Sequence, residues 1–156
     1  AVLKSSGIKN GLVNAGGDLM AFGTRDGTQD WHIGLQHPRK PEAMIASLNL
    51  SGRAVATSGD YQRYFIQDGT RYHHILNPQN GQPVRSTISA TVIASSVTDA
   101  DALATAVFVL GSDRGIALIN SLDGVEGMVL PKSGIPNFSA GFRSLPGFSF
   151  KGFDPR

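Results

Sequence analysis

The segment STISATVIASSVTDADALATAVFVLG, residues 86–111, carries the clearest structural signals in the chain. Its first part, residues 86–96, is rich in β-branched side chains, which favour extended backbone, and therefore predicts a strand. Its second part has apolar residues at helical spacing and predicts a helix. We expect Thr98 to cap that helix, with Asp101 three residues later in a variant of the capping box. The apolar remainder, residues 106–110, is expected to anchor the helix in the core.

Shorter strands are predicted around this segment, and a second helix follows it. Gly111 is expected to end the first helix as its C′ residue, and Ser112 to cap the second. A hairpin is predicted around Asp68-Gly69, a favoured two-residue turn. The predicted strands lie within residues 11–23, 31–38, 43–52, 53–78, 86–96 and 124–131. Strands clustered before a helical pair predict an α+β fold, with a mostly antiparallel sheet and a C-terminal helical pair.

The composition limits the domain count and the classes of function. Of 156 residues, 40% belong to the hydrophobic set, so residues 1–156 can bury a sizeable core as a single domain. The formal net charge of +2 is too small, and the Lys and Arg residues too scattered, to predict nucleic-acid binding. The absence of cysteine excludes a disulfide scaffold and a thiolate site. The first residues read as the last turns of a helix ending at Gly7, so we expect the chain to be one piece of a longer polypeptide.

Asp101 and Thr105 lie four residues apart in the predicted helix. Side chains at this spacing share a helical face about 5–6 Å apart, so a carboxylate and a hydroxyl can point to one place. Hard cations such as Mg²⁺ take oxygen ligands, and often bind one or two protein groups together with substrate phosphates. Alternatively, Asp99 and Asp101 stabilise the positive end of the helix, and the Thr105 hydroxyl bonds a backbone carbonyl. The local sequence alone favours this second interpretation.

Three further motifs could bind a ligand. NAGGD, residues 14–18, could form an anion-binding nest of backbone amides, or it could be an ordinary glycine turn. ATSGDYQR, residues 56–63, joins hydroxyls, an amide and the Tyr61 ring, which would suit a nucleotide or a flavin, although turn residues at a strand end are the simpler interpretation. RYHHILNP, residues 71–78, places two histidines on opposite faces of a strand, where they are poor joint metal ligands. One of them could act as a general base near pH 7, or serve as a hydrogen-bonded structural side chain.

The order of these motifs is more informative than any one of them. Signatures of serine hydrolases, spaced-histidine zinc enzymes and P-loop proteins are absent from the sequence. Taken together, LVNAGGDL, AVATSGDYQRYF, HHILNPQNGQP and SATVIASSVTDADALATAVFVLG closely resemble the ApbE family of flavin transferases. The resemblance runs from about Leu12 to Gly111. It implies transfer of FMN from FAD, the substrate, to a threonine hydroxyl of a target protein, with Mg²⁺ as cofactor and AMP as the second product.

The resemblance also implies roles for particular residues. It places the metal ligands at Asp101 and Thr105, a candidate catalytic base at His74, and contact with the flavin nucleotide along the backbone at Ile75. Asn77 stands where family members commonly have aspartate, and both residues suit a turn before proline. The remaining cofactor-binding positions implied by the resemblance are Gly16, Gly17, Asp18, Thr57, Ser58 and Gly59.

Partners and location follow from the same resemblance. Family members are longer, and their N-terminal half supplies much of the FAD pocket, so we expect that missing half as a partner of this chain. The expected target is a flavin-carrier protein of a respiratory electron-transfer complex. Many relatives are exported, as periplasmic or membrane-anchored lipoproteins, and we expect the same here. Two alternatives use the same features: an FAD pyrophosphatase that gives FMN and AMP, and a non-catalytic flavin-binding module.

Overall fold

The computed structural model describes residues 2–154, and its centre is a six-stranded sheet. Every neighbouring pair of strands in this central sheet is antiparallel. The strands, in spatial order, are β1 (Gly11–Ala15), β2 (Asp18–Phe22), β5 (Arg53–Gly59), β8 (Thr87–Ala94), β9 (Glu126–Pro131) and β10 (Asn137–Phe138). The antiparallel pairing confirms the α+β class predicted from the sequence.

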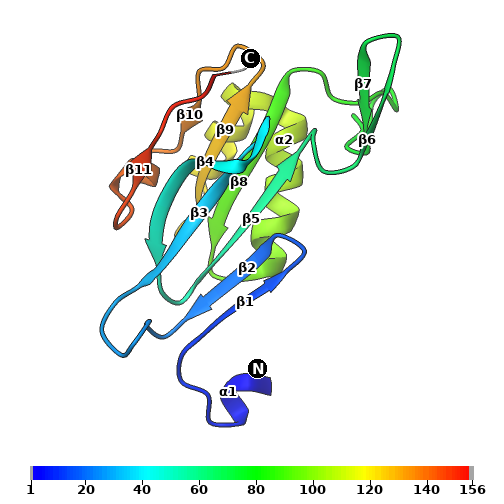
Figure 1. Cartoon of the computed structure of the whole chain (residues 1–156). Helices are drawn as coiled ribbons and strands as arrows, with labels where there is room; N and C mark the ends of the chain where they lie inside the picture. Colours follow the sequence, from blue (N-terminus) through cyan, green and yellow to red (C-terminus); the bar gives the residue numbers. More distant parts are fainter. Residues whose placement is uncertain (1, 155–156) are drawn as a thin grey trace.

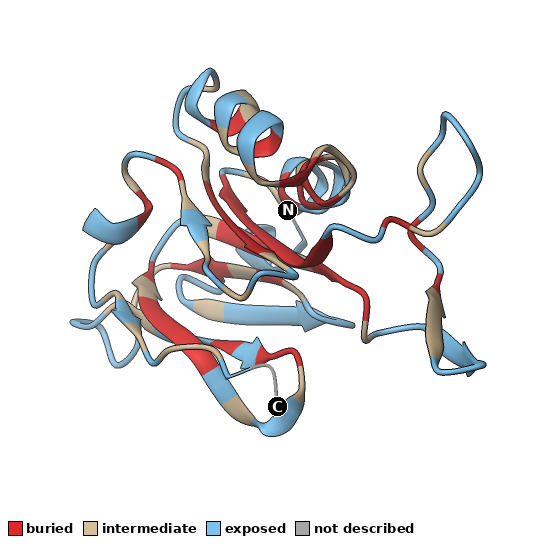
Figure 2. Cartoon of the chain, turned by 90° about the horizontal axis from the view of Figure 1, so that it is seen from above, coloured by how far each residue is buried: buried red, intermediate tan, exposed pale blue. Residues whose placement is uncertain are grey.

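A smaller sheet packs on one face of the central sheet, and helix α2 (Val97–Asn120) covers the other face (Figure 1). The smaller sheet is also antiparallel and has the order β11-β4-β3. Its strands are β3 (Trp31–His37), β4 (Lys40–Leu50) and β11 (Ser149–Phe150). One apolar core lies between the two sheets, and a second lies between the central sheet and α2. Figure 2 shows α2 lying along the buried strands of the central sheet.

Strand β8 is buried along its whole length because both of its faces are covered. Side chains alternate between the faces of a strand. Ala90 and Val92 therefore belong to the core beneath α2, whereas Thr91 and Ile93 point toward the smaller sheet. This two-sided burial confirms the strand that the β-branched pattern predicted.

The N-terminus of α2 differs from the prediction. Its cap is Ser96, whose Oγ accepts a hydrogen bond from the Asp99 N–H at 3.1 Å and donates one to the Asp99 carboxylate at 2.6 Å. The prediction of Thr98 as the cap is wrong, because Thr98 already lies in the first helical turn. Asp99 therefore pairs with the cap residue through both its N–H and its carboxylate, and Asp101 takes no part in these bonds.

Gly111 divides α2 into two helical segments. Its φ of 77° and ψ of −172° are not helical, so the predicted helical pair is present with the predicted break. A side chain at this positive φ would be strained, which explains a glycine here. The expected side-chain cap at Ser112 is wrong, since its hydroxyl is buried and has no hydrogen-bond partner within residues 2–154. The predicted helical pair lies in the C-terminal half of the chain, and β9, β10 and β11 follow it.

The buried face of α2 is built mainly from small residues. Ala100, Ala104 and Val107 are fully buried against the central sheet, together with the Phe108 ring. Leu110, predicted to lie in the core, is only partly buried. By length and composition α2 could cross a membrane, but it packs along the central sheet as a core helix. The small side chains allow the helix backbone to lie close to the alanines of β5 and β8.

A separate hairpin projects from the body of the protein (Figure 1). It pairs β6 (Tyr64–Gln67) with β7 (Thr70–His73) in antiparallel register. The φ angles of Asp68 and Gly69 are 49° and 70°. Two consecutive positive φ angles are what a tight two-residue hairpin turn requires, so the predicted turn is confirmed.

The two ends of the chain add short elements. Helix α1 (Val2–Ser5) ends just before Gly7, whose φ of 83° fits the predicted helix end. A 3-10 helix, η1 (Phe142–Ser144), follows β10. Rings of the C-terminal tail pack on one another within 5.9 Å between centroids: Phe138 with Phe142, Phe148 and Phe150. This aromatic packing joins the tail to the core between the sheets, a role that the sequence left open.

Candidate functional site

Asp101 and Thr105 lie in the first three turns of α2, at the four-residue spacing that the sequence predicted. Both are exposed, whereas Ala100 and Ala104 beside them are fully buried. Ser96 and Asp99 already bond each other at the helix N-terminus. Capping therefore accounts for Asp99, and Asp101 remains available to a ligand.

A hydrogen bond joins Thr105 to the end of β5. Thr105 Oγ1 lies 2.9 Å from Oγ of Ser58, which is buried. The alternative in which Thr105 bonds a backbone carbonyl is therefore not the arrangement found. A hydroxyl has one proton and two lone pairs, so Thr105 can accept the Ser58 proton and still offer an oxygen lone pair outward. Ser58 and Thr105, which come from separate sequence motifs, are thus brought together.

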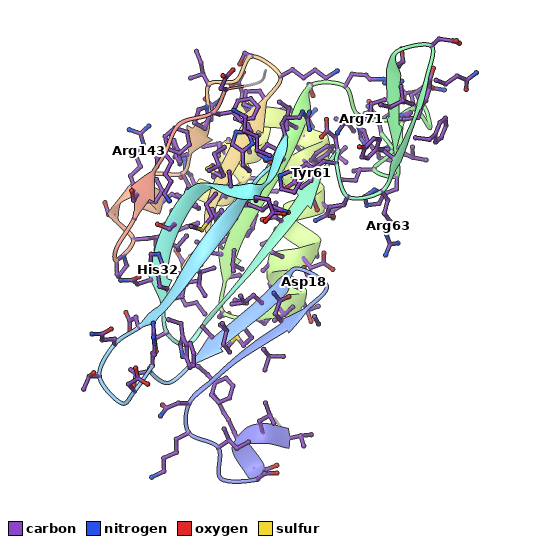
Figure 3. All side chains as sticks on the ribbon, in the orientation of Figure 1. Asp18, His32, Tyr61, Arg63, Arg71 and Arg143 are labelled. Carbon is purple, nitrogen blue, oxygen red and sulfur yellow. The ribbon has the colours of Figure 1, made fainter. Side chains whose placement is uncertain are left out.

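A second carboxylate, Asp18, lies in the electrostatic range of Asp101. Burial and, next in size, the negative charge of Asp101 raise the pKa of Asp18 above its usual value. Figure 3 shows Asp18 at the end of the β1–β2 hairpin, beside α2. Within residues 2–154, neither carboxylate takes part in a salt bridge. Two like charges thus approach each other without a cation from the chain.

These groups fit a hard divalent cation. Carboxylate and hydroxyl oxygens are the ligands that Mg²⁺ prefers, and it usually keeps positions for water and phosphate oxygens. A cation between Asp18 and Asp101 would remove the repulsion that raises the pKa of Asp18. The described part of the chain contains no cluster of three or more histidine, cysteine or acidic side chains. The protein side of such a site is therefore small: two carboxylates, with the Thr105 hydroxyl as a third oxygen.

The glycine motif forms the tight turn between β1 and β2. Gly16 and Gly17 have φ angles of 69° and 111°, which side chains rarely adopt. The Gly17 N–H donates to Oδ1 of Asn14 at 2.9 Å, so one of the two amides is occupied within the turn. The ordinary-turn interpretation thus explains both glycines, and the turn also places Asp18 at the start of β2.

Thr57 and Ser58 point to opposite faces of the central sheet, as neighbours on a strand must. Thr57 hydrogen-bonds Thr91 at 2.9 Å between hydroxyl oxygens, and faces a cavity of about 230 Å³ between the two sheets. Tyr61 and Gly17 line the same cavity. The predicted cofactor-binding residues therefore divide between the α2 face and this cavity, and do not form one pocket.

Gly59 and Tyr61 are packed together at the end of β5. A Cβ on Gly59 would come within 2.4 Å of the Tyr61 ring, so only glycine allows this packing. Burial, and next the negative charge of Asp60, raise the pKa of Tyr61 to about 12. Tyr61 therefore stays protonated, and its hydroxyl remains a hydrogen-bond donor at neutral pH.

The adjacent histidines have the opposite exposures that strand geometry predicted. His73 is buried: its Nε2 lies 2.8 Å from the Val84 carbonyl and its Nδ1 accepts from the Ile75 N–H at 3.3 Å. These two bonds fix the neutral tautomer with the proton on Nε2. His74 is exposed, and its Nδ1 lies 3.3 Å from the Arg63 carbonyl. His73 is thus the structural histidine, and His74 is the one available to a ligand.

The backbone of Ile75 is already engaged within the protein. Its N–H bonds His73, and its carbonyl accepts from the Val84 N–H at 3.1 Å. The Ile75 side chain is buried in the core beneath α2. This packing fixes the position of the segment that follows the two histidines.

Sequence reasoning missed two polar side chains at this site. Asn14 holds the glycine turn and lines the cavity between the sheets. Asparagine commonly bonds nearby backbone in turns, so its place before Gly16 was a usable signal. Ser96 was also recognisable, because the serine and Asp99 have the spacing of a capping box.

Comparison with known proteins adds independent information. The model of the ApbE family matches residues 1–129. An FAD:protein FMN transferase of Vibrio cholerae (O395) is 38% identical over 154 residues, covering 97% of this chain and 44% of that protein. One of Klebsiella pneumoniae (strain 342) is 36% identical over 133 residues, covering 84% of this chain and 40% of that protein. The chain thus spans about two fifths of the length of these curated relatives.

Solved structures are similar over the same part. The crystal structure of the ApbE protein of Thermotoga maritima superposes with a TM-score of 0.80 at 43% identity, covering 87% of this chain and 44% of that one. The apo flavinyl transferase ApbE of Pseudomonas stutzeri gives a TM-score of 0.76 at 37% identity, covering 94% and 46%. The antiparallel sheets with α2 are therefore an architecture shared with these proteins.

Proposed function

The chain belongs to the ApbE family, and from this premise we propose that it is the C-terminal part of an Mg²⁺-dependent FAD:protein FMN transferase. The observation that carries the proposal is the group formed by Asp18, Asp101, Thr105 and Ser58. It joins β2, β5 and α2, and combines two uncompensated carboxylates with a fixed hydroxyl. Curated relatives with this name support the activity. The reaction we propose moves FMN from FAD to a threonine hydroxyl of a target protein and releases AMP.

Asp101 and Thr105 would hold the cation, with Asp18 close enough to share its charge. When bound, Mg²⁺ supplies neutralisation of charge on the pyrophosphate oxygens of FAD. Thr105 is oriented by its hydrogen bond to Ser58, so its hydroxyl oxygen would be available to the cation in a fixed orientation. Asp101 is exposed on the same helical face and needs no rearrangement to reach a ligand. The chain therefore provides a small preorganised set of oxygens, completed by the phosphates of the substrate.

His74 is the proposed general base. With its Nδ1–H donating to the Arg63 carbonyl, its Nε2 carries a free lone pair. The hydroxyl oxygen of the target threonine forms a bond to the phosphorus atom of the FMN moiety, and the bond from that phosphorus to the AMP oxygen breaks. The hydroxyl proton passes to Nε2 of His74, and AMP leaves. The exposure of His74 allows a protein substrate to approach it.

The glycine turn and the end of β5 are the proposed supports of the nucleotide. Gly16 and Gly17 bring backbone close to the Asp18 side of the site, and Gly59 lets Tyr61 fold against the strand. The Thr57 hydroxyl opens into the cavity between the sheets. We propose that FAD contacts this rim, with the N-terminal half expected from the resemblance covering the remainder.

Partner and location are proposed from the resemblance alone. The acceptor would be a flavin-carrier protein of a respiratory electron-transfer complex. The location would be exported, as a periplasmic or membrane-anchored lipoprotein. Exposed apolar residues of the N-terminal region, including Val2, Leu12 and Val13, support contact with a further protein segment.

The test uses the complete polypeptide that carries this chain. It is incubated with FAD, Mg²⁺ and a flavin-carrier domain, and the products are analysed by intact mass and chromatography. Covalent FMN on the carrier together with AMP supports the proposal. FMN and AMP in solution with an unmodified carrier would instead indicate the pyrophosphatase. FAD binding without AMP would indicate a non-catalytic flavin-binding module.

A further inference from the structure

A group of cations lines a pocket along β7 of the β6–β7 hairpin, separate from the acidic group on α2. Arg39, Arg71, Arg85 and Lys132 line it, together with the buried carboxylate of Asp60. Four cations against one carboxylate leave three positive charges uncompensated. The pocket has a volume of about 290 Å³, which accommodates a carboxylate-bearing side chain. We call this set the basic pocket.

Asp60 holds two of the four cations in place. Its two carboxylate oxygens accept from Arg39 at 2.7 and 2.8 Å in a bidentate pair, and Arg71 donates to one of them at 3.3 Å. Paired geometry of this kind fixes a guanidinium more firmly than a single contact does. One carboxylate shared by Arg39 and Arg71 cannot neutralise both, so a positive charge remains.

Aromatic rings and a carbonyl position the other contacts. The Arg71 guanidinium lies 4.1 Å from the centre of the Tyr64 ring, and Arg85 lies 4.7 Å from that of Tyr72. Arg85 also donates to the Arg71 carbonyl at 2.5 Å. Rings and carbonyls carry no net charge, so they orient the guanidinium groups and leave the charge for a ligand. Figure 3 shows Arg71 beside the hairpin, on the side of Tyr61, and the two residues line one pocket.

An apolar edge borders the basic pocket. All four residues of β6 are exposed, with Tyr64, Phe65 and Ile66 exposed by 46%, 60% and 61%. The Phe65 ring stacks on Tyr72 at 5.2 Å between centroids, which keeps it fixed while exposed. Exposed aromatic residues next to arginines are typical of protein-binding surfaces, in which Tyr, Phe and Arg are enriched.

The basic pocket lies near the proposed site of transfer. Phe108 is three residues beyond Thr105 on the same helix, a rise of about 4.5 Å. Its ring meets the ring of His73 at 5.5 Å between centroids, and His73 lines the basic pocket. An extended polypeptide advances about 3.3 Å per residue. A few residues of an acceptor can therefore connect a threonine at the transfer site with a side chain in the pocket.

We propose that the basic pocket binds a carboxylate side chain of the acceptor protein, while β6 contacts an apolar residue of the same segment. The proposal rests on the proposed transfer function, because that function requires a protein acceptor. We infer an acidic segment from charge complementarity, because three uncompensated cations attract carboxylates and repel basic segments. The pocket thus selects and orients the acceptor, whereas FAD is bound at the group around Asp101 and Thr105 on α2.

The test uses the complete polypeptide that carries this chain, with Arg85→Gln and Lys132→Gln combined. Arg39 and Arg71 are kept because they pair with Asp60. The first measurement is fluorescence anisotropy of a fluorescein-labelled peptide of aspartate and phenylalanine, with an asparagine–phenylalanine peptide for comparison. Loss of two exposed charge contacts should weaken binding of the acidic peptide about tenfold. The KM for the flavin-carrier protein should rise by the same factor, whereas the Kd for FAD stays unchanged.

Arg143→Gln with Lys151→Gln is the matched control, because Arg143 also stacks on a ring, Phe138, and lies on the far side of the molecule (Figure 3). This control pair should leave peptide binding and the KM for the carrier unchanged. Arg85→Lys keeps the positive charge and should therefore bind the acidic peptide as the parent does. Equal binding of the two peptides, or a double variant that binds as tightly as the parent, would overturn the proposal. So would a defect confined to FAD binding. Selective peptide binding by a parent protein that transfers no FMN would refute the transfer function and leave the carboxylate pocket standing.

Discussion

The hydroxyl oxygens of Ser58 and Thr105 lie 2.9 Å apart and join the end of β5 to the third turn of α2. Ser58 is buried, so the core determines the direction of this bond. Thr105 is exposed and would otherwise rotate freely among its preferred rotamers. The contact therefore orients an exposed oxygen beside Asp101, which is the preorganisation that a small cation site needs.

Asp101→Asn should abolish the proposed metal-dependent transfer. The change removes a negative charge from the ligand set and keeps its shape. Mg²⁺ affinity, measured by calorimetric titration of the complete polypeptide, should fall by at least about 100-fold, since loss of groups that only support a ligand already costs 10–100-fold. Asp99→Asn is the control on the same helix. It weakens only the bonds to Ser96, so melting temperature should fall slightly and Mg²⁺ affinity should persist; equal loss in both variants would contradict a ligand role for Asp101.

Ser58→Ala tests whether Thr105 is positioned by its partner. The variant leaves Thr105 in place but removes the hydrogen bond that orients it, so Mg²⁺ affinity should fall about tenfold, as for other supporting groups. The free energy of unfolding should change by about 1 kcal/mol, the net value of one hydrogen bond. Thr57→Ala is the neighbouring control, because that hydroxyl faces the cavity between the sheets. Unchanged affinity in Ser58→Ala would show that Thr105 needs no orientation.

Asp18→Asn should stabilise the metal-free protein at neutral pH. The pKa of Asp18 is raised in the folded state by burial and then by Asp101, so the fold disfavours its charged form. The free energy of unfolding of the parent should fall as pH rises from 3.8, the unperturbed pKa, through the raised pKa of Asp18. Above that range the ionised Asp18 destabilises the folded state to its full extent. Below this pH range Asp18 is protonated in both the folded and the unfolded protein, so the stabilities of variant and parent should differ little.

Thermal unfolding of Asp18→Asn and its parent at a series of pH values checks this dependence. The difference in melting temperature should favour the variant above that pH range and shrink as pH falls. Saturating Mg²⁺ should reverse the order at neutral pH, because the cation stabilises only the parent carboxylate. A variant less stable than the parent at neutral pH without metal would be incompatible with a raised pKa.

Local signals in the sequence were sufficient for most elements. The β-branched run of β8, the Asp68-Gly69 turn and the glycine break at position 111 each follow from backbone preferences of a few residues, and all are present. The prediction of the cap was wrong because serine and threonine are both good N-cap residues, and Ser96 lies only two residues before Thr98.

Long-range packing could not be obtained in this way. The bond between Ser58 and Thr105 joins residues 47 positions apart, and the basic pocket draws its cations from four separate segments. The tail packs through Phe138 and its aromatic neighbours, a contact that the spacing of apolar residues in the sequence does not predict. Alternation along β5 was predictable, but it also separates Thr57 from Ser58, so residues adjacent in one motif serve two different faces.

Substitutions at the two adjacent histidines should have different effects: one at His73 should lower stability, and one at His74 should lower activity. His73→Ala removes a buried ring that bonds Val84 and Ile75 and meets Phe108, so unfolding should become easier by about 2–4 kcal/mol. His74→Gln changes an exposed side chain and should leave the melting temperature within about 2 °C, as for most surface substitutions.

His74→Gln should instead reduce FMN transfer by about 10²–10⁴-fold, the usual contribution of a positioned base, with FAD affinity retained. The retained FAD affinity and melting temperature distinguish this role from a structural one. A variant that transfers FMN at the parent rate would assign the base to another group.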